Sequence, residues 1–154
     1  MEMEISIPDS PHFRNIIAIV FGLMVSAIAV GTIEMLGHQI YPELADLDYE
    51  DDAQMRTILS NAPATALVCI IAAWTCGNFF GCFVAGVMGT EQGTFCCIVL
   101  SVIIAFLAVT MLSQIPMPKW FTFLGLVMLI PGGFAGWWLS RFTLDKLQSS
   151  VIDK

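Results

Sequence analysis

The sequence predicts an all-α, polytopic membrane protein with four transmembrane helices and a short amphipathic helix in the first loop. Of its 154 residues, 57% are hydrophobic and only 12% are charged, whereas about 25% of the residues in an ordinary soluble domain are charged. The mean hydropathy is +0.81, and four apolar runs approach or exceed the roughly 20 residues that a helix needs to cross a bilayer. Because these runs fill most of the chain, we expect a single four-span membrane domain over residues 1–154.

The first predicted span covers residues 13–37 and follows an acidic lead-in that contains two prolines. This lead-in lacks the basic residues and the small-residue cleavage site of a secretory signal peptide, so we expect no cleavable signal peptide. Along the span, Ala27, Gly31, Glu34 and His38 recur at intervals of four, three and four residues, which places them on one helix face. We therefore expect a seam of small residues that continues into Glu34 and His38.

The loop of residues 39–62 is the one sizeable aqueous segment. It holds six acidic residues between positions 43 and 52, which lack the glycine and the ligand spacing of an EF-hand and therefore favour a solvated loop over a Ca²⁺ site. Met55, Ile58 and Leu59 follow at helical spacing. They predict the short amphipathic helix, lying along the outer membrane interface.

The second predicted span covers residues 63–88 and carries a regular series of small side chains. The series recurs every four residues and consists of Cys69, Ala73, Gly77, Gly81, Ala85 and Gly89. Small residues at this interval let two helix backbones approach closely, so the series predicts a packing seam with a partner in the same chain or in another copy. Asn78 lies about 22 Å along this span and could either bond a neighbouring helix or line a polar path.

The third and fourth predicted spans cover residues 94–113 and 119–140 and are joined by short connections. Gly132 and Gly136 offer another small-residue surface, and Pro131 just before them is expected to interrupt or kink its helix. Tryptophans near both ends of the fourth span match the aromatic belts of membrane interfaces.

The distribution of cationic residues predicts the orientation in the membrane. Four of the six lysines and arginines fall on the side that carries both termini, namely Arg14, Arg141, Lys146 and Lys154. The positive-inside rule therefore favours cytoplasmic termini. The net charge of −7 argues against nucleic acid as a partner. All five cysteines fall inside predicted spans, so we expect small buried apolar residues and no disulfide framework.

The main candidate site consists of Glu34, His38 and Tyr41, which share one face of a helix at spacings of four and three. An ionisable residue beside a lipid-spanning stretch is costly, which makes it a functional-site candidate. Glu34 follows Phe13 by 21 residues, or about 31 Å of helix, so we expect it near the outer boundary of the hydrocarbon core. There the pair could fasten the first span to the loop helix, and Asn78 completes the set of candidate polar residues.

Two other uses of Glu34 and His38 stay open at this point. Histidine titrates near neutral pH, so the pair could relay protons. The two side chains could also contribute ligands to Zn²⁺, although the only other histidine, His12, is predicted on the opposite side. The sequence shows neither a serine-hydrolase motif nor a His-Glu-x-x-His motif, so we expect neither an enzyme nor a cofactor.

Residues 34–42 (EMLGHQIYP), the acidic loop, Pro63 and the WTCGNFFGCFVAG segment together carry a resemblance. The chain resembles small uncharacterised bacterial four-helix membrane proteins over most of its length. The resemblance implies four spans in the bacterial inner membrane and no particular chemistry. Glutathione-dependent membrane enzymes fit poorly because these spans lack arginine after Arg14 at the start of the first span. Small multidrug exporters carry their key glutamate in mid-helix, unlike Glu34.

These observations favour a non-enzymatic integral membrane protein that serves as a structural or accessory component. We expect it to form a homo-oligomer, built on the second-span glycine seam, or to join a partner in a membrane complex. The alternative is a small channel, or a proton- or metal-linked transporter, that uses Glu34, His38 and Asn78.

Overall fold

The computed structural model describes residues 10–42, 58, 62–90, 93–115 and 117–152. In these residues the chain forms four α-helices, which are α1 (Pro11–Ile40), α3 (Ala64–Met88), α4 (Gly93–Gln114) and α5 (Lys119–Ile152). Each helix is long and apolar enough to cross a membrane. The predicted all-α architecture with four candidate spans is therefore confirmed, whereas most of the predicted amphipathic loop helix lies outside the described residues.

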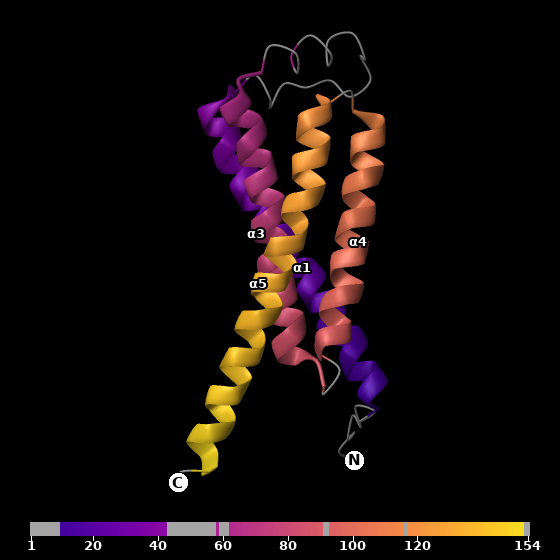
Figure 1. Ribbon diagram of the computed structural model, residues 1–154, viewed down its shortest axis with the longest axis vertical. Helices are drawn as coiled ribbons and strands as arrows, with labels where there is room; N and C mark the ends of the chain where they lie inside the picture. The colour runs from indigo at the N-terminus through magenta and orange to yellow at the C-terminus, as the bar shows by residue number, and fades with distance from the viewer. Residues whose placement is uncertain (1–9, 43–57, 59–61, 91–92, 116, 153–154) are drawn as a thin grey trace, which may run out of the picture.

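The helices form an elongated bundle in which α3 is the most buried member. α3 packs against α1 on one face and α5 on another, and α4 contacts all three of its neighbours. We call the end where α1 finishes and α3 begins the loop end, and the opposite end the terminal end. The first turn of α1 and the last turns of α5 both lie at the terminal end (Figure 1).

The first three helices begin and end within a few residues of the predicted spans. Ser10 caps α1, because its hydroxyl oxygen accepts a hydrogen bond from the backbone N–H of Phe13 at 3.3 Å, and Pro11 occupies the first turn. α5 differs from the prediction because it continues to Ile152, well beyond position 140. The segment after Ser140 contains neither glycine nor proline, so nothing ends the helix where the apolar run ends.

Pro131 lies inside α5 without interrupting it, contrary to the expectation of a break. A proline in a helix removes one N–H donor and loses one backbone bond. Neighbouring helices in a membrane bundle commonly offset such a loss. Here Gly132 and Gly136 bring α5 against α3 immediately after the proline, which holds the helix in place.

α1 and α3 meet through small residues along the middle of the bundle. A Cβ atom added to Gly81 would lie 2.9 Å from the carbonyl oxygen of Gly22, and one added to Gly77 would lie 3.2 Å from that of Ser26. The two backbones therefore touch, as small-residue seams allow. Four of the six predicted seam residues (Ala73, Gly77, Gly81 and Ala85) are buried within the single chain, whereas Cys69 and Gly89 are partly exposed.

The predicted seam of α1 lies on a different face from the observed one. The buried face of α1 carries Asn15, Ala18, Gly22 and Ser26. Ala27 and Gly31 are exposed, and an added Cβ at Gly31 would meet no atom within 4 Å. Ala27 and Gly31 of the predicted seam therefore make no helix contact within the single chain. Both faces of α1 carry small residues at similar spacing, and Gly22 and Ser26 match the glycines of α3.

α5 uses its own glycines to approach the other side of α3. A Cβ atom at Gly132 would lie 2.6 Å from the carbonyl oxygen of Thr75, and one at Gly136 would clash with the carbonyl of Phe79. α3 therefore has two faces in close backbone contact with neighbours of the same chain. Its glycine seam is occupied by α1, so it is not free to join another copy.

Candidate functional site

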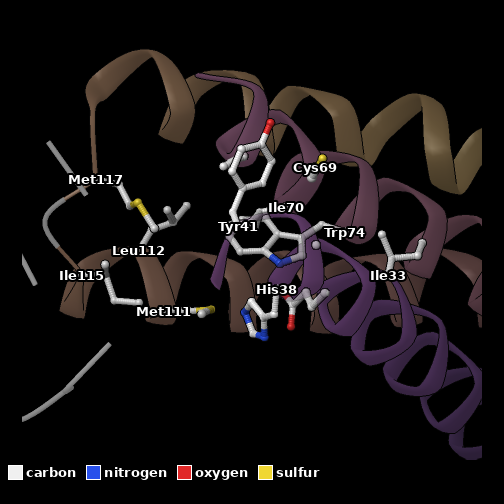
Figure 2. A pocket seen from close by; sticks show the side chains of 13 residues that line it. Ile33, His38, Tyr41, Cys69, Ile70, Trp74, Met111, Leu112, Ile115 and Met117 are labelled. Carbon is white, nitrogen blue, oxygen red and sulfur yellow. The ribbon is translucent and has the colours of Figure 1, made fainter. Parts of the chain in front are cut away.

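The candidate site is a cavity of about 90 Å³ at the loop end of the bundle (Figure 2). Its walls come from the last turns of α1, the first turns of α3 and the end of α4 with the connection that follows. Most of the lining is apolar, including Ile33, Ile70, Leu112 and Ile115. Polar groups enter from α1 and from Trp74 of α3, so a small number of hydrogen-bonding groups face a largely apolar space.

Glu34 reaches the cavity from α1 and is half-buried there. Its carboxylate lies close enough to the indole N–H of Trp74 and to the imidazole of His38 to interact electrostatically with both. Figure 2 shows the indole nitrogen of Trp74 directed toward the side of the cavity where His38 lies. The carboxylate therefore joins α1 to α3, while His38 stays exposed at the rim.

Trp74 is held in position by aromatic packing. Its ring meets that of Phe121 of α5 edge to face, with the ring centroids 5.8 Å apart, and both residues belong to one buried apolar cluster. Edge-to-face pairs of this kind add to the stabilisation from burial. The donor that faces Glu34 is thus fixed by contacts between α3 and α5.

Tyr41 follows the last residue of α1 and closes the same cavity. Its hydroxyl lies 2.7 Å from the hydroxyl of Thr65 in the first turn of α3. This hydrogen bond fastens the end of α1 to the start of α3. Glu34, His38 and Tyr41 are therefore brought together in one cavity at the loop end of the bundle.

Asn78 belongs to a different polar group, between α3, α4 and α5. Its side-chain amide donates to the carbonyl oxygen of Leu129 at 2.8 Å, and its side-chain oxygen accepts from the hydroxyl of Ser101 at 3.1 Å and the thiol of Cys82 at 3.4 Å. The side chain is almost completely buried. Asn78 of α3 therefore makes hydrogen bonds to both α4 and α5.

The Glu34 cavity and the groove beside Asn78 share no lining residue. Trp74 lines the first and Leu129 lines the second, and both belong to the same buried apolar cluster. Apolar packing therefore lies where a continuous route between the two polar groups would have to run within one chain.

Sequence reasoning missed Trp74 and Thr65, which are the partners of Glu34 and Tyr41 on α3. Both partners are far from α1 along the chain, and neither carries a local signal that would pair it with an acidic residue or a tyrosine. Asn15 was not predicted from the sequence either. Its side-chain oxygen accepts hydrogen bonds from the backbone N–H of Thr90 at 3.1 Å and from the Thr90 hydroxyl at 2.9 Å. α1 is thus attached to its neighbours at both ends by polar contacts.

In the part of the chain that the structure describes, no three His, Cys, Asp or Glu side chains are grouped as metal ligands would be. The acidic residues between positions 43 and 52, for which the sequence favours a solvated loop over a Ca²⁺ site, lie outside that part. Neither a family model nor a curated protein nor a solved structure that was compared matches this chain. The site is therefore interpreted from its own geometry.

Proposed function

We propose that this chain is a non-enzymatic, multi-pass membrane protein that serves as a structural or accessory component of a membrane assembly. In this proposal the Glu34 site fastens α1 to α3 at the outer end of the bundle. The main support for this fastening role is the contact of the Glu34 carboxylate with the indole of Trp74 on α3. A charge that is turned toward a donor on a neighbouring helix stabilises the packing of the two helices.

The arrangement of polar groups supports a fastening role over permeation. A conduction route needs polar groups or water along the whole path through the bilayer. The Glu34 cavity ends against the cluster that contains Trp74, and the hydrogen-bonding groups of Asn78 are taken up by Leu129, Ser101 and Cys82. A transporter built on Glu34 and His38 is the second candidate, because His38 is exposed at the rim of the cavity.

The proposal includes association with a further copy or with a partner protein. The glycine seam of α3 is used inside the chain, so association needs another surface. Ala27 and Gly31 form an exposed pair of small residues one turn apart on α1. Such a pair allows the close approach of another membrane helix, and it replaces the α3 seam as the proposed contact.

The proposed location is the bacterial inner membrane with both termini in the cytoplasm. The bacterial inner membrane is supported by the resemblance of residues 34–42 and the segments after them to small bacterial four-helix membrane proteins. The cytoplasmic termini are supported by the excess of Arg and Lys on the side that carries them.

A flux assay in proteoliposomes separates the two candidate functions. Purified chain, Glu34→Gln and His38→Gln are reconstituted, and the uptake of protons and of Zn²⁺ is followed with encapsulated dyes. The proposal predicts uptake at the rate of empty liposomes in all three cases. Asp145→Asn, an exposed position of α5 near the terminal end, serves as the control substitution. Flux in the wild type that is lost in Glu34→Gln but kept in Asp145→Asn would establish transport and refute the fastening role.

A further inference from the structure

The face between α4 and α5 contains a second hollow, away from the Glu34 site. It is a groove of about 470 Å³ whose walls include Ile98 and Val102 of α4 and Ile130 and Phe134 of α5. Each of these four side chains is more than half exposed. We call this hollow the α4–α5 groove. Because its walls are apolar and open outward, it suits a hydrocarbon chain.

The length of the groove matches one leaflet of a bilayer. On α4 its lining runs from Thr94 to Ala105, and on α5 it runs from Leu126 to Trp137. Each stretch contains twelve residues, which span about 16 Å of helix, or about half of the roughly 30 Å hydrocarbon core. A packed transmembrane helix would contact about twice this length, whereas one acyl chain fits it.

A cation stands at the end of the groove that faces the membrane surface. The hydroxyl oxygen of Thr94 accepts hydrogen bonds from the indole N–H of Trp137 at 3.0 Å and from the guanidinium of Arg141 at 2.7 Å. These bonds hold Arg141 beside the groove while using one of the five N–H donors of the guanidinium. The other donors suit the oxygens of a phosphate, which arginine binds in a bidentate manner.

We propose that the α4–α5 groove binds an anionic phospholipid, with an acyl chain along the groove and the phosphate at Arg141. The floor of the groove supports an apolar occupant, because Asn78 already bonds Leu129 and accepts from Ser101 there. Arg141 lies at one end of the groove, and the apolar walls extend away from it. A phospholipid has its charged headgroup and its acyl chain in the same arrangement. This site is separate from the Glu34 cavity and does not depend on the role proposed for it.

Native mass spectrometry of the full chain in neutral detergent tests the proposal. Dioleoylphosphatidylglycerol and dioleoylphosphatidylcholine are titrated in parallel, and the fraction of protein carrying each lipid is measured. A cation near the membrane surface contributes about 1 kcal/mol, so phosphatidylglycerol should bind at roughly fivefold lower concentration than phosphatidylcholine. Equal binding of the two lipids would overturn the proposal.

Substitutions separate the headgroup contact from the groove. Arg141→Gln should weaken the binding of phosphatidylglycerol to the level of phosphatidylcholine. Arg141→Lys should keep part of the difference between the two lipids. Arg14→Gln is the matched control, because Arg14 lies at the same end of the bundle on α1 and is exposed. A preference that survives Arg141→Gln, or that is lost equally in Arg14→Gln, would contradict the assignment.

Ala105→Phe fills the inner end of the groove and leaves Arg141 with its Thr94 partner. It should weaken the binding of both lipids, so it tests the groove even if loss of the guanidinium prevents folding. Unchanged lipid binding in Ala105→Phe would show that the acyl chain does not lie in the α4–α5 groove. A second copy of the protein cross-linked across the groove, with no retained lipid, would also overturn the proposal.

Discussion

Asn78 shows how a strongly polar side chain is accommodated in the middle of an apolar bundle. It contacts α5 through the carbonyl of Leu129 and α4 through the hydroxyl of Ser101, while its own backbone is part of α3. Three helices are therefore joined at one residue. Because an unpaired amide in such surroundings is costly, the bonds favour one relative position of the three helices over others.

Asn78→Leu should destabilise the bundle by about 1 kcal/mol, the usual size of an interhelical hydrogen bond in a membrane. The substitution removes the bonds of Asn78 to the carbonyl of Leu129 and the hydroxyl of Ser101, while Ser101 keeps its contact with the Cys82 thiol. The free energy of unfolding is measured by titration with sodium dodecyl sulfate in mixed micelles. Gln148→Leu, at an exposed position of α5, is the control. Equal stability of Asn78→Leu and the wild type would show that the side chain does not join the helices.

The sequence predicts where along its helix Glu34 lies, but not which residue it contacts. Counting helical rise from Phe13 places it near one end of its span, and the structure has it at the loop end with His38 and Tyr41. Its partner Trp74 could not be predicted, because the pairing depends on how α1 rotates against α3. That rotation is determined by the contact between Gly22 and Gly81, which only the folded bundle reveals.

At the scale of helices, the lengths of apolar runs predict α1, α3 and α4 closely because a bilayer requires a minimum length. The faces of these helices are harder to predict. In a soluble helix the buried face is the apolar one, but lipid is as apolar as the interior of a membrane bundle, so hydrophobicity does not distinguish the two faces. Small residues remain as the signal, and α1 carries them on both faces. The sequence therefore does not indicate that Gly22 and Ser26, and not Ala27 and Gly31, contact α3 within the chain.

The contact between α1 and α3 predicts a difference between two glycine substitutions. Gly81→Ala places a methyl group 2.9 Å from the carbonyl oxygen of Gly22, so the backbones must separate, which we expect to cost about 1–3 kcal/mol. Gly37→Ala is the matched control, because an added Cβ there meets no atom within 4 Å. Alanine is the better helix former, so Gly37→Ala should be neutral or stabilising by up to about 1 kcal/mol.

Both variants are compared by the same detergent titration. A loss of stability in Gly81→Ala alone supports the close backbone contact. Similar stability of the two variants would contradict the packing of α1 on α3.

At the scale of the whole molecule, α1 is attached to the rest of the bundle by three kinds of contact. Asn15 bonds Thr90 at the terminal end, glycines meet glycines in the middle, and Glu34 and Tyr41 contact α3 at the loop end. The outward face of α1 takes no part in these contacts. The same helix can therefore join the bundle on one face and another membrane helix on the other.

If the chain associates through this outward face, a bulky residue there should weaken association without unfolding the protein. Gly31→Leu projects into open space in the single chain, so its unfolding curve should match that of the wild type. We expect a shift toward the monomer in analytical ultracentrifugation in density-matched detergent. Ala135→Leu, at an exposed small residue of α5, controls for added bulk on a lipid-facing surface. An unchanged distribution of oligomers in Gly31→Leu would place the contact elsewhere.

The proposed function depends above all on the contact between Glu34 of α1 and Trp74 of α3. A double-mutant cycle of Glu34→Gln and Trp74→Phe tests it most directly, with the free energy of unfolding as the quantity measured. Hydrogen bonds to charged groups contribute about 1.5–3 kcal/mol, and the rim of the cavity is partly exposed, so we predict a coupling energy near 1 kcal/mol between the two positions. Additive effects of the two substitutions, with no coupling beyond about 0.3 kcal/mol, would contradict the claim.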